Sequence, residues 1–369
     1  MHKITFFPVG NGDSCMIDLH NGTKMLFDYA NLTTGTKDDL RIDLGKALQE
    51  ELKQDRRDYF DVVGFTHADD DHVCGASDFF YLEHAAKYQS NTRIKINELW
   101  VPAAMILEEN LDGDARIIRQ EARHRLIQGK GIRVFSRPDR LKRWLESNGL
   151  TLEKRKHLIT DAGQLVPGFQ KMSHGVEFFV HSPFAEHIGN TLIDRNECSL
   201  ILHATFLISG IETKFLLIGD STHEVLTDIV NITKFHHNET RLKWDIFDIP
   251  HHCSYLALND EKGKNKTVPV EEVKWLLEQG ARRGILVSSS NSIPSNDENT
   301  QPPHRQAANC YKEYANIING EFRATMEFPS KTSPEKMVIT IDGAGATLKK
   351  AIASGINVIT SQPSPRAGN

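Results

Sequence analysis

Six consecutive residues of this 369-residue chain include five side chains that can bind a metal ion, in the segment His67-Ala68-Asp69-Asp70-Asp71-His72. The segment follows an apolar run, residues 61–66, whose composition predicts a buried strand. Charged groups at the end of a buried strand need partners, because an unpaired buried charge is costly. Neutral imidazole and carboxylate are ligands that suit zinc, manganese or iron better than calcium. The segment therefore predicts a divalent-metal site, with a solvated acidic loop as the weaker alternative.

Two further apolar runs end in side chains of the same kind. Residues 214–219 lead into Asp220, and residues 245–250 lead into His251-His252-Cys253-Ser254. In α/β folds the carboxyl ends of strands are where functional groups gather. Each of these two motifs is a weak signal alone. Together with the first segment they supply enough ligands for two metal ions.

Short apolar runs alternate with helical patterns along the chain, which favours helices that cover sheets in an α/β or α+β fold. Residues 20–23 (HNGT) predict a hairpin turn between two strands. Strands are predicted at residues 4–7, 15–19, 24–27, 62–66, 99–102, 176–181, 199–207, 215–218, 244–249, 284–288 and 336–341. Helices are predicted at residues 38–53, 77–87, 106–128, 140–148, 271–279 and 304–318.

The overall composition is that of an ordinary globular protein. The formal net charge is −5 and 39% of the residues are hydrophobic, which excludes a disordered chain and a uniformly basic nucleic-acid binder. No apolar run reaches the roughly 18 residues of a membrane span, and the first residues lack the layout of a signal peptide. The five cysteines form no CxxC pair, which favours a reducing compartment. We therefore expect a cytoplasmic protein with no membrane segment.

One region departs from this average charge. Residues 116–156 contain 13 Lys and Arg against 4 Asp and Glu, within a helical segment at residues 104–160. Two interpretations remain open. The segment is either a solvated helical insertion with an arginine-rich outer face, or a surface that attracts the phosphates of a nucleic acid.

In combination, the motifs resemble those of metallo-β-lactamase-fold hydrolases, and more narrowly the hydrolase domain of the ComEC-type competence proteins. The resemblance covers about residues 1–310, in the order expected for the family. The matching segments are a glycine loop at residues 7–14, a strand end at residues 26–28, an HxHxDH-like motif at residues 66–72, a Gly-Asp motif at residues 216–220, a PHHGS-like motif at residues 250–254 and the pair Pro303-His304.

The resemblance implies a four-layer αββα sandwich with the site at the edge between its two sheets. Residues 1–345 would form this hydrolase domain, residues 104–160 a basic helical insertion, and residues 346–369 a partly flexible tail. The family pattern implies one or two divalent ions, zinc or manganese, held by His67, Asp69, Asp71, His72, Asp220 and His252. In that pattern His67 and Asp69 face the first ion, Asp71, His72 and His252 face the second, and Asp220 bridges them.

Catalytic roles are implied for Asp71, Asp220, His251 and His304. His251 would face the substrate or support a ligand. His304 would either contact a substrate phosphate or donate a proton to the leaving group, or else simply begin a helix. Asp13, in the glycine loop, is expected to order that turn or a ligand histidine rather than to bind the metal.

The chain departs from the family pattern in three places, and the first two of these departures affect the first ion. Asp69 stands where the family has its second histidine, and a carboxylate shifts the preference towards manganese or iron. No histidine matches the one that many members place before the Gly-Asp motif, because His181 and His203 are more typical of ordinary strand positions. Cys74 and Cys253 replace glycines of the family beside the site. The first metal position is therefore expected to be weak, absent, or completed by water and substrate.

These features predict a metal-dependent hydrolase, most simply a phosphodiesterase or nuclease that acts on nucleic acid. Two alternatives stay open. One is a small-molecule ester or phosphoester hydrolase, and the other is a non-catalytic regulatory module with an incomplete metal site. The sequence predicts neither a protein partner nor an oligomeric state.

Overall fold

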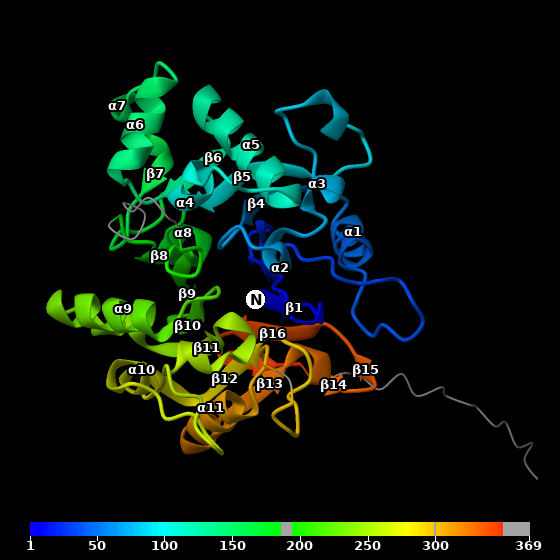
Figure 1. Ribbon diagram of the computed structural model, residues 1–369, viewed down its shortest axis with the longest axis vertical. Helices are drawn as coiled ribbons and strands as arrows, with labels where there is room; N and C mark the ends of the chain where they lie inside the picture. The colour runs from blue at the N-terminus through cyan, green and yellow to red at the C-terminus, as the bar shows by residue number, and fades with distance from the viewer. Residues whose placement is uncertain (186–193, 299, 350–369) are drawn as a thin grey trace, which may run out of the picture.

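Two large β-sheets stacked face to face form the centre of the molecule, and helices cover their outer faces (Figure 1). The structure is a computed structural model that describes residues 1–185, 194–298 and 300–349. Buried apolar side chains form three clusters. One cluster lies between the two sheets, and one lies between each sheet and its helices. The molecule is thus a four-layer αββα sandwich, which confirms the expected fold class.

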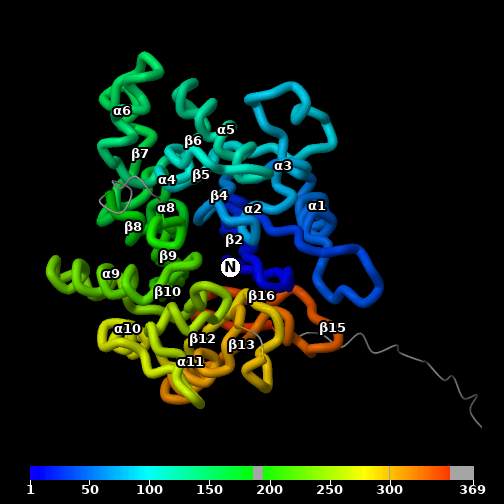
Figure 2. The backbone as a smooth tube through the Cα atoms, viewed as in Figure 1, coloured from blue at the N-terminus to red at the C-terminus, as the bar shows by residue number. Residues whose placement is uncertain are grey.

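The first sheet has nine strands in the described part of the chain. Its first five strands in spatial order pair antiparallel, and from β3 onward the neighbours are parallel. Figure 2 shows the late strand β16 returning beside the first strand β1. The order is β17 (Gly345–Leu348), β16 (Met337–Asp342), β1 (His2–Phe6), β2 (Cys15–Asp18), β3 (Lys24–Phe27), β4 (Tyr59–Gly64), β5 (Lys95–Pro102), β6 (Ile132–Phe135) and β7 (Ile159–Thr160).

The second sheet has six strands within the described residues. Strands β8, β9 and β10 pair antiparallel, whereas β10 to β13 run parallel. The order is β13 (Glu321–Ala324), β12 (Gly280–Ser288), β11 (Trp244–Asp248), β10 (Ile211–Leu217), β9 (Ile201–Ile208) and β8 (Val176–Ser182). A small separate ribbon consists of β14 (Pro329–Ser330) and β15 (Ser333–Pro334).

Each sheet has its own set of covering helices. The first sheet packs against α1 (Leu44–Gln54), α3 (Ala76–Phe79), α4 (Ala103–Leu107), α5 (Gly113–Gln128) and α6 (Asp139–Ser147). The second packs against α9 (His223–Phe235), α10 (Glu271–Leu277) and α11 (Arg305–Ile317). Three short helices complete the set: α2 (Asp70–Val73), α7 (Leu152–Arg155) and α8 (Lys171–His174). None of the described helices combines the length and the apolarity that crossing a bilayer requires.

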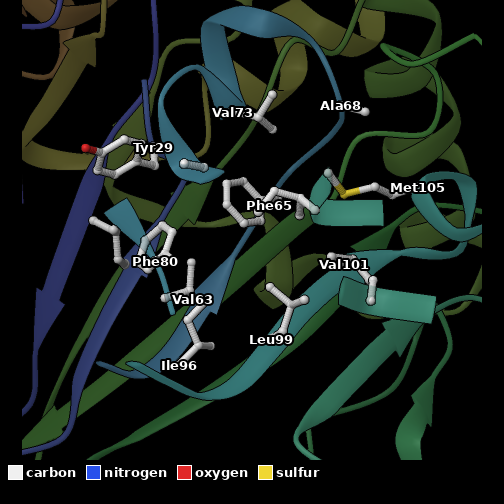
Figure 3. Packing of buried hydrophobic residues seen from close by; sticks show 14 of the residues in the cluster. Tyr29, Val63, Phe65, Ala68, Val73, Phe80, Ile96, Leu99, Val101 and Met105 are labelled. Carbon is white, nitrogen blue, oxygen red and sulfur yellow. The ribbon is translucent and has the colours of Figure 1, made fainter. Parts of the chain in front are cut away.

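The loop that follows β4 is fixed by its apolar residues. Phe65, Ala68 and Val73 are each at most 4% exposed and belong to the core beneath the helices of the first sheet. Figure 3 shows them beside Val63 and Leu99, which come from β4 and β5. Since Phe65, Ala68 and Val73 flank the histidines and aspartates in the sequence, burying these apolar side chains fixes the loop and turns the polar side chains away from this core. The packing therefore positions the candidate ligands.

Two glycines let the strand ends approach each other. A Cβ added to Gly219, just after β10, would lie 2.9 Å from Cβ of Thr66, and one added to Gly64 would lie 2.8 Å from the Phe27 ring. Real side chains do not tolerate such contacts without a shift of the neighbour. The glycine of the Gly-Asp motif is thus needed to bring Asp220 next to the loop that follows β4.

The expected basic insertion at residues 104–160 is largely an integral part of the fold. It supplies β6 and β7 to the first sheet, and α5 to its helical layer. Arg125 is 2% exposed, donates to the carbonyls of Ile96 and Gly131 at 3.0 and 2.9 Å, and pairs with Glu121. Arg119 is 7% exposed and donates to the carbonyl of Glu108. Several of its arginines therefore stabilise the fold instead of facing a polyanion.

Several predicted elements differ from those observed. Strands β6, β7, β13 and β17 and helix α9 were not predicted. The helix predicted at residues 77–87 is wrong, because only α3 and a 3-10 turn at Ala86–Tyr88 form there. Strand β17 carries the sheet past the expected domain end at residue 345, as far as Leu348. The rest of the expected tail, residues 350–369, lies outside the described residues.

Candidate metal centre

Four side chains from four separate segments meet at one edge of the sandwich. Asp13 lies in the loop between β1 and β2, His72 in α2, Asp220 just after β10, and His252 in the turn after β11. One potential ligand atom from each lies within 4.8 Å of all the others. Three of the four were predicted ligands, whereas Asp13 was expected to order its turn or a ligand histidine.

The spacing of the ligand atoms suits a shared cation. His72 Nε2 lies 3.2 Å from Asp220 Oδ1, and His252 Nε2 lies 3.3 Å from Asp220 Oδ2. His252 Nε2 is also 3.2 Å from Asp71 Oδ2. Ligand atoms about 2.1 Å from one tetrahedral ion would be about 3.4 Å apart. The observed separations are close to that value.

Both histidine rings are oriented by a partner on their far side. Nδ1 of His72 lies 2.9 Å from a carboxylate oxygen of Asp28, and Nδ1 of His252 lies 2.8 Å from the carbonyl of Ser289. Asp28 is itself held by the backbone N–H and the hydroxyl of Thr66, both at 2.7 Å. When Nδ1–H donates to these oxygens, the lone pair of Nε2 faces the centre of the group. In this orientation each ring, once neutral, would offer Nε2 as a ligand.

Several buried atoms in this group and in the neighbouring His67 lack a hydrogen-bond partner among the described residues. They are Nε2 of His67, Nε2 of His72 and Oδ1 of Asp220. The last two lie near each other without the geometry of a hydrogen bond. Leaving buried polar atoms unpaired is unfavourable, and a cation in the four-residue group would satisfy the atoms of His72 and Asp220. The residues present therefore fit a divalent metal, and their mixed nitrogen and oxygen donors suit zinc, manganese or iron.

The electrostatics of the group favour added positive charge. Burial lowers the pKa of His72 and of His252, but nearby carboxylates, Asp220 above all, outweigh it and leave both pKa values well above their usual range. Burial raises the pKa of Asp220, but the two histidines hold it well below its usual range. Burial is also the main reason that the pKa of Asp13 is raised to about 6. This concentration of carboxylates would attract a metal ion.

A second group shares His72 with the first. It contains His67, Asp71 and His72, and the rings of His67 and His72 have centroids 3.9 Å apart. Asp69, a predicted ligand of the first ion, belongs to neither group. Its carboxylate instead contacts the guanidinium of Arg195 and lies 3.4 Å from Nε2 of His67. Asp69 is therefore the one predicted ligand that the described structure does not bring into a metal-sized group.

The two predicted proton-transfer histidines have different surroundings. His251 lies at the margin of the centre, with Nε2 3.9 Å from Asp220 Oδ2, and burial lowers its pKa. Nε2 of His304 donates to the carbonyl of Thr300 at 3.1 Å, and its Nδ1 accepts from the N–H of Tyr255 at 3.3 Å. Both ring nitrogens of His304 are thus occupied. The structure supports the helix-start role of His304 and not the role in proton donation.

The turn that carries His252 has an unusual backbone. His251, His252 and Cys253 have φ values of 51°, 50° and 67°, in the left-handed region that side chains other than glycine disfavour. Cys253 is fully buried and belongs to none of the candidate metal groups among the described residues. The strained turn places His252 over the centre.

Comparisons with known proteins give structural resemblances only. No family model and no curated protein match the chain. Among solved structures, an inferred metal-dependent hydrolase from Parabacteroides distasonis ATCC 8503 matches with 12% identity and a TM-score of 0.34, covering 87% of this chain and 92% of that one. A diphosphatase from the PhnP family matches with 8% identity and a TM-score of 0.33, covering 78% and 86%. A long form RNase Z from yeast matches with 12% identity and a TM-score of 0.37, covering 91% of this chain and 41% of its own. The assignment of the site therefore rests on the geometry described above.

Proposed function

We propose that this chain is a metal-dependent hydrolase of phosphodiesters, with its active centre at Asp13, Asp71, His72, Asp220 and His252. The observation that supports it is the convergence of these side chains at one sheet edge, with buried ligand atoms left unpaired. Such an arrangement is costly in a protein that does not use it.

The residues of the centre have different roles in the proposed hydrolysis. A divalent cation held by Asp13, His72, Asp220 and His252 would supply Lewis acidity for a phosphoryl or carbonyl oxygen and for water. Asp28 and the Ser289 carbonyl keep His72 and His252 in the orientation that exposes Nε2. His251, whose pKa is lowered by burial, lies beside the centre and accepts or returns a proton there.

The preference for phosphodiesters, with nucleic acid as a candidate substrate, rests on the exposed cations of residues 104–160. Arg116, Lys142 and Arg143 are exposed there and could attract a polyanion. A second candidate, hydrolysis of a small ester or phosphoester, is favoured by the burial of Arg119 and Arg125 in internal contacts. These contacts leave fewer arginines to track a nucleic acid than the sequence alone predicts.

The test is a hydrolysis assay with purified protein loaded with manganese or zinc. We expect cleavage of single- or double-stranded oligonucleotides or of a chromogenic phosphodiester, and loss of that cleavage on chelation and in Asp71→Ala and Asp220→Ala. Asp58→Ala is the matched control, because Asp58 is exposed and pairs only with Lys95 at the surface. Cleavage of small carboxylic esters alone would support the second candidate. Metal binding without any hydrolysis would identify a non-catalytic module.

A further inference from the structure

An arginine clamp lies beside the centre, outside both metal-sized groups. Arg195 contacts Oδ1 of Asp69 through Nη1. From its other side, Glu108 accepts from Nε at 2.9 and 3.1 Å and from Nη2 at 2.7 Å. Asp69 and Arg195 are 126 positions apart in the chain, so this contact is purely tertiary. The guanidinium is thus held between two carboxylates.

The clamp is linked to the centre through one carboxylate. The second oxygen of Asp69 lies 3.4 Å from Nε2 of His67, and the His67 ring packs against that of His72. One oxygen of Asp69 therefore contacts Arg195, and the other lies near His67. A metal ion bound by His67 and Asp69 would share this carboxylate with a guanidinium, and the two cations would repel each other.

We propose that Arg195 takes the place of a second metal ion, so that the centre holds a single ion, at Asp13, His72, Asp220 and His252. The inference rests on the proposed function and refines its metal content. Glu108 orients Arg195, because its carboxylate accepts hydrogen bonds from the guanidinium on the side away from Asp69. Arg195 is then a positioning residue that withdraws Asp69 from the ligand set and supplies a permanent positive charge in its place.

The experiment measures the metal content of the full chain. Protein equilibrated with excess manganese and then desalted is analysed for metal per chain, and its electron paramagnetic resonance spectrum is recorded. We expect one ion per chain in the wild type, with the signal of an isolated ion. In Arg195→Ala, Asp69 becomes free to join His67 and Asp71, and we expect two ions per chain with an exchange-coupled signal.

Three further variants complete the test, and the first of them examines the role of Asp69. Adding Asp69→Asn to Arg195→Ala should return the content to one ion. Arg323→Ala, which removes a half-exposed arginine paired with Glu321 on β13, is the matched control and should retain one ion. If Arg195→Ala does not fold, Arg195→Gln keeps most of the side-chain volume, lacks the charge and should also bind two ions.

The outcomes separate the two proposals. Two ions in the wild type, or one ion in both folded Arg195 variants, would overturn the role of Arg195 and leave the proposed function standing. Failure of the wild type to retain any ion would overturn both. Two ions in the Arg195 variants and one in the wild type would support the inference.

Discussion

Two pairs of buried histidines lie in opposite surroundings in this molecule. His72 and His252 are anchored through Nδ1, and their Nε2 atoms face the carboxylates of the centre. His181 on β8 and His203 on β9 donate Nε2 to backbone carbonyls, each at 2.9 Å. Carboxylates raise the pKa values of the first pair, whereas burial lowers those of the second pair to about 4 and about 3.

Burial alone therefore does not mark a ligand. All four histidines are at most 4% exposed, yet only the first pair presents a ring nitrogen to negatively charged groups. The hydrogen-bond partner of each ring, here called its anchor, causes this difference, because it determines which ring nitrogen remains available to an ion. His181 and His203 are ordinary strand histidines, as the sequence indicated.

The strongest test of this comparison replaces one member of each pair. We expect His252→Ala to weaken metal binding by more than about 100-fold, since even supporting residues of metal sites contribute about 10- to 100-fold. His203→Gln should leave the affinity within about 2-fold, while it costs on the order of 1–3 kcal/mol of stability through the lost hydrogen bond. Chelator competition and urea unfolding measure the two effects. Equal effects on metal affinity would contradict the distinction.

A second substitution tests the contact between Asp28 and Nδ1 of His72. Asp28→Ala removes the oxygen that fixes Nδ1 of His72, and we expect metal affinity to fall by about 10- to 100-fold with the ligands all present. The surface variant Asp58→Ala provides the baseline in the same titration. An Asp28→Ala protein with unchanged affinity would show that His72 needs no anchor.

The histidines of the second pair predict how stability depends on pH. Their folded pKa values lie below the unfolded value of about 6.5, so the neutral form is stabilised and the stability is lost as pH falls below about 6.5. Between pH 7 and pH 5 we expect each to contribute a loss on the order of 1–2 kcal/mol. Urea unfolding of His203→Gln across this range should show a shallower decline than the wild type. An identical decline would mean that His203 does not titrate on unfolding.

The smallest expected effect concerns the arginines of residues 104–160, where exposed side chains can be compared with those buried in internal contacts. Arg116→Glu and Arg143→Glu change exposed side chains and should weaken binding of a nucleic acid by a few-fold each, with a shallower salt dependence. Fluorescence anisotropy with a labelled oligonucleotide measures both quantities. Indifference to both substitutions, together with turnover of small phosphoesters, would favour the small-molecule candidate.

The parts of the site that follow strands were predictable from the sequence. Apolar runs that end in His, Asp or Gly-Asp indicate where strands stop, and parallel strands deliver such ends to one edge. His72, Asp220 and His252 come together for that reason. The four layers follow from the alternation of short apolar runs and amphipathic helices.

The remaining parts depend on contacts that no local pattern contains. Whether Asp69 is available as a ligand depends on Arg195, and whether His304 can transfer a proton depends on Tyr255 and Thr300. Helix α9 was missed for a local reason, because β-branched residues are frequent in His223–Phe235 and blur its helical pattern. The residue type indicates what a side chain can bind. Only the folded structure shows whether that side chain is already engaged in another contact.

The left-handed turn at His251–Cys253 links ion capture to local folding. A residue other than glycine in this conformation costs on the order of 1 kcal/mol, and three follow one another here. An ion that binds His252 would favour the folded turn over its relaxed alternatives, and part of its binding free energy would be used to order the backbone. The loaded protein would then resist local opening at residues 250–254 better than the metal-free protein does.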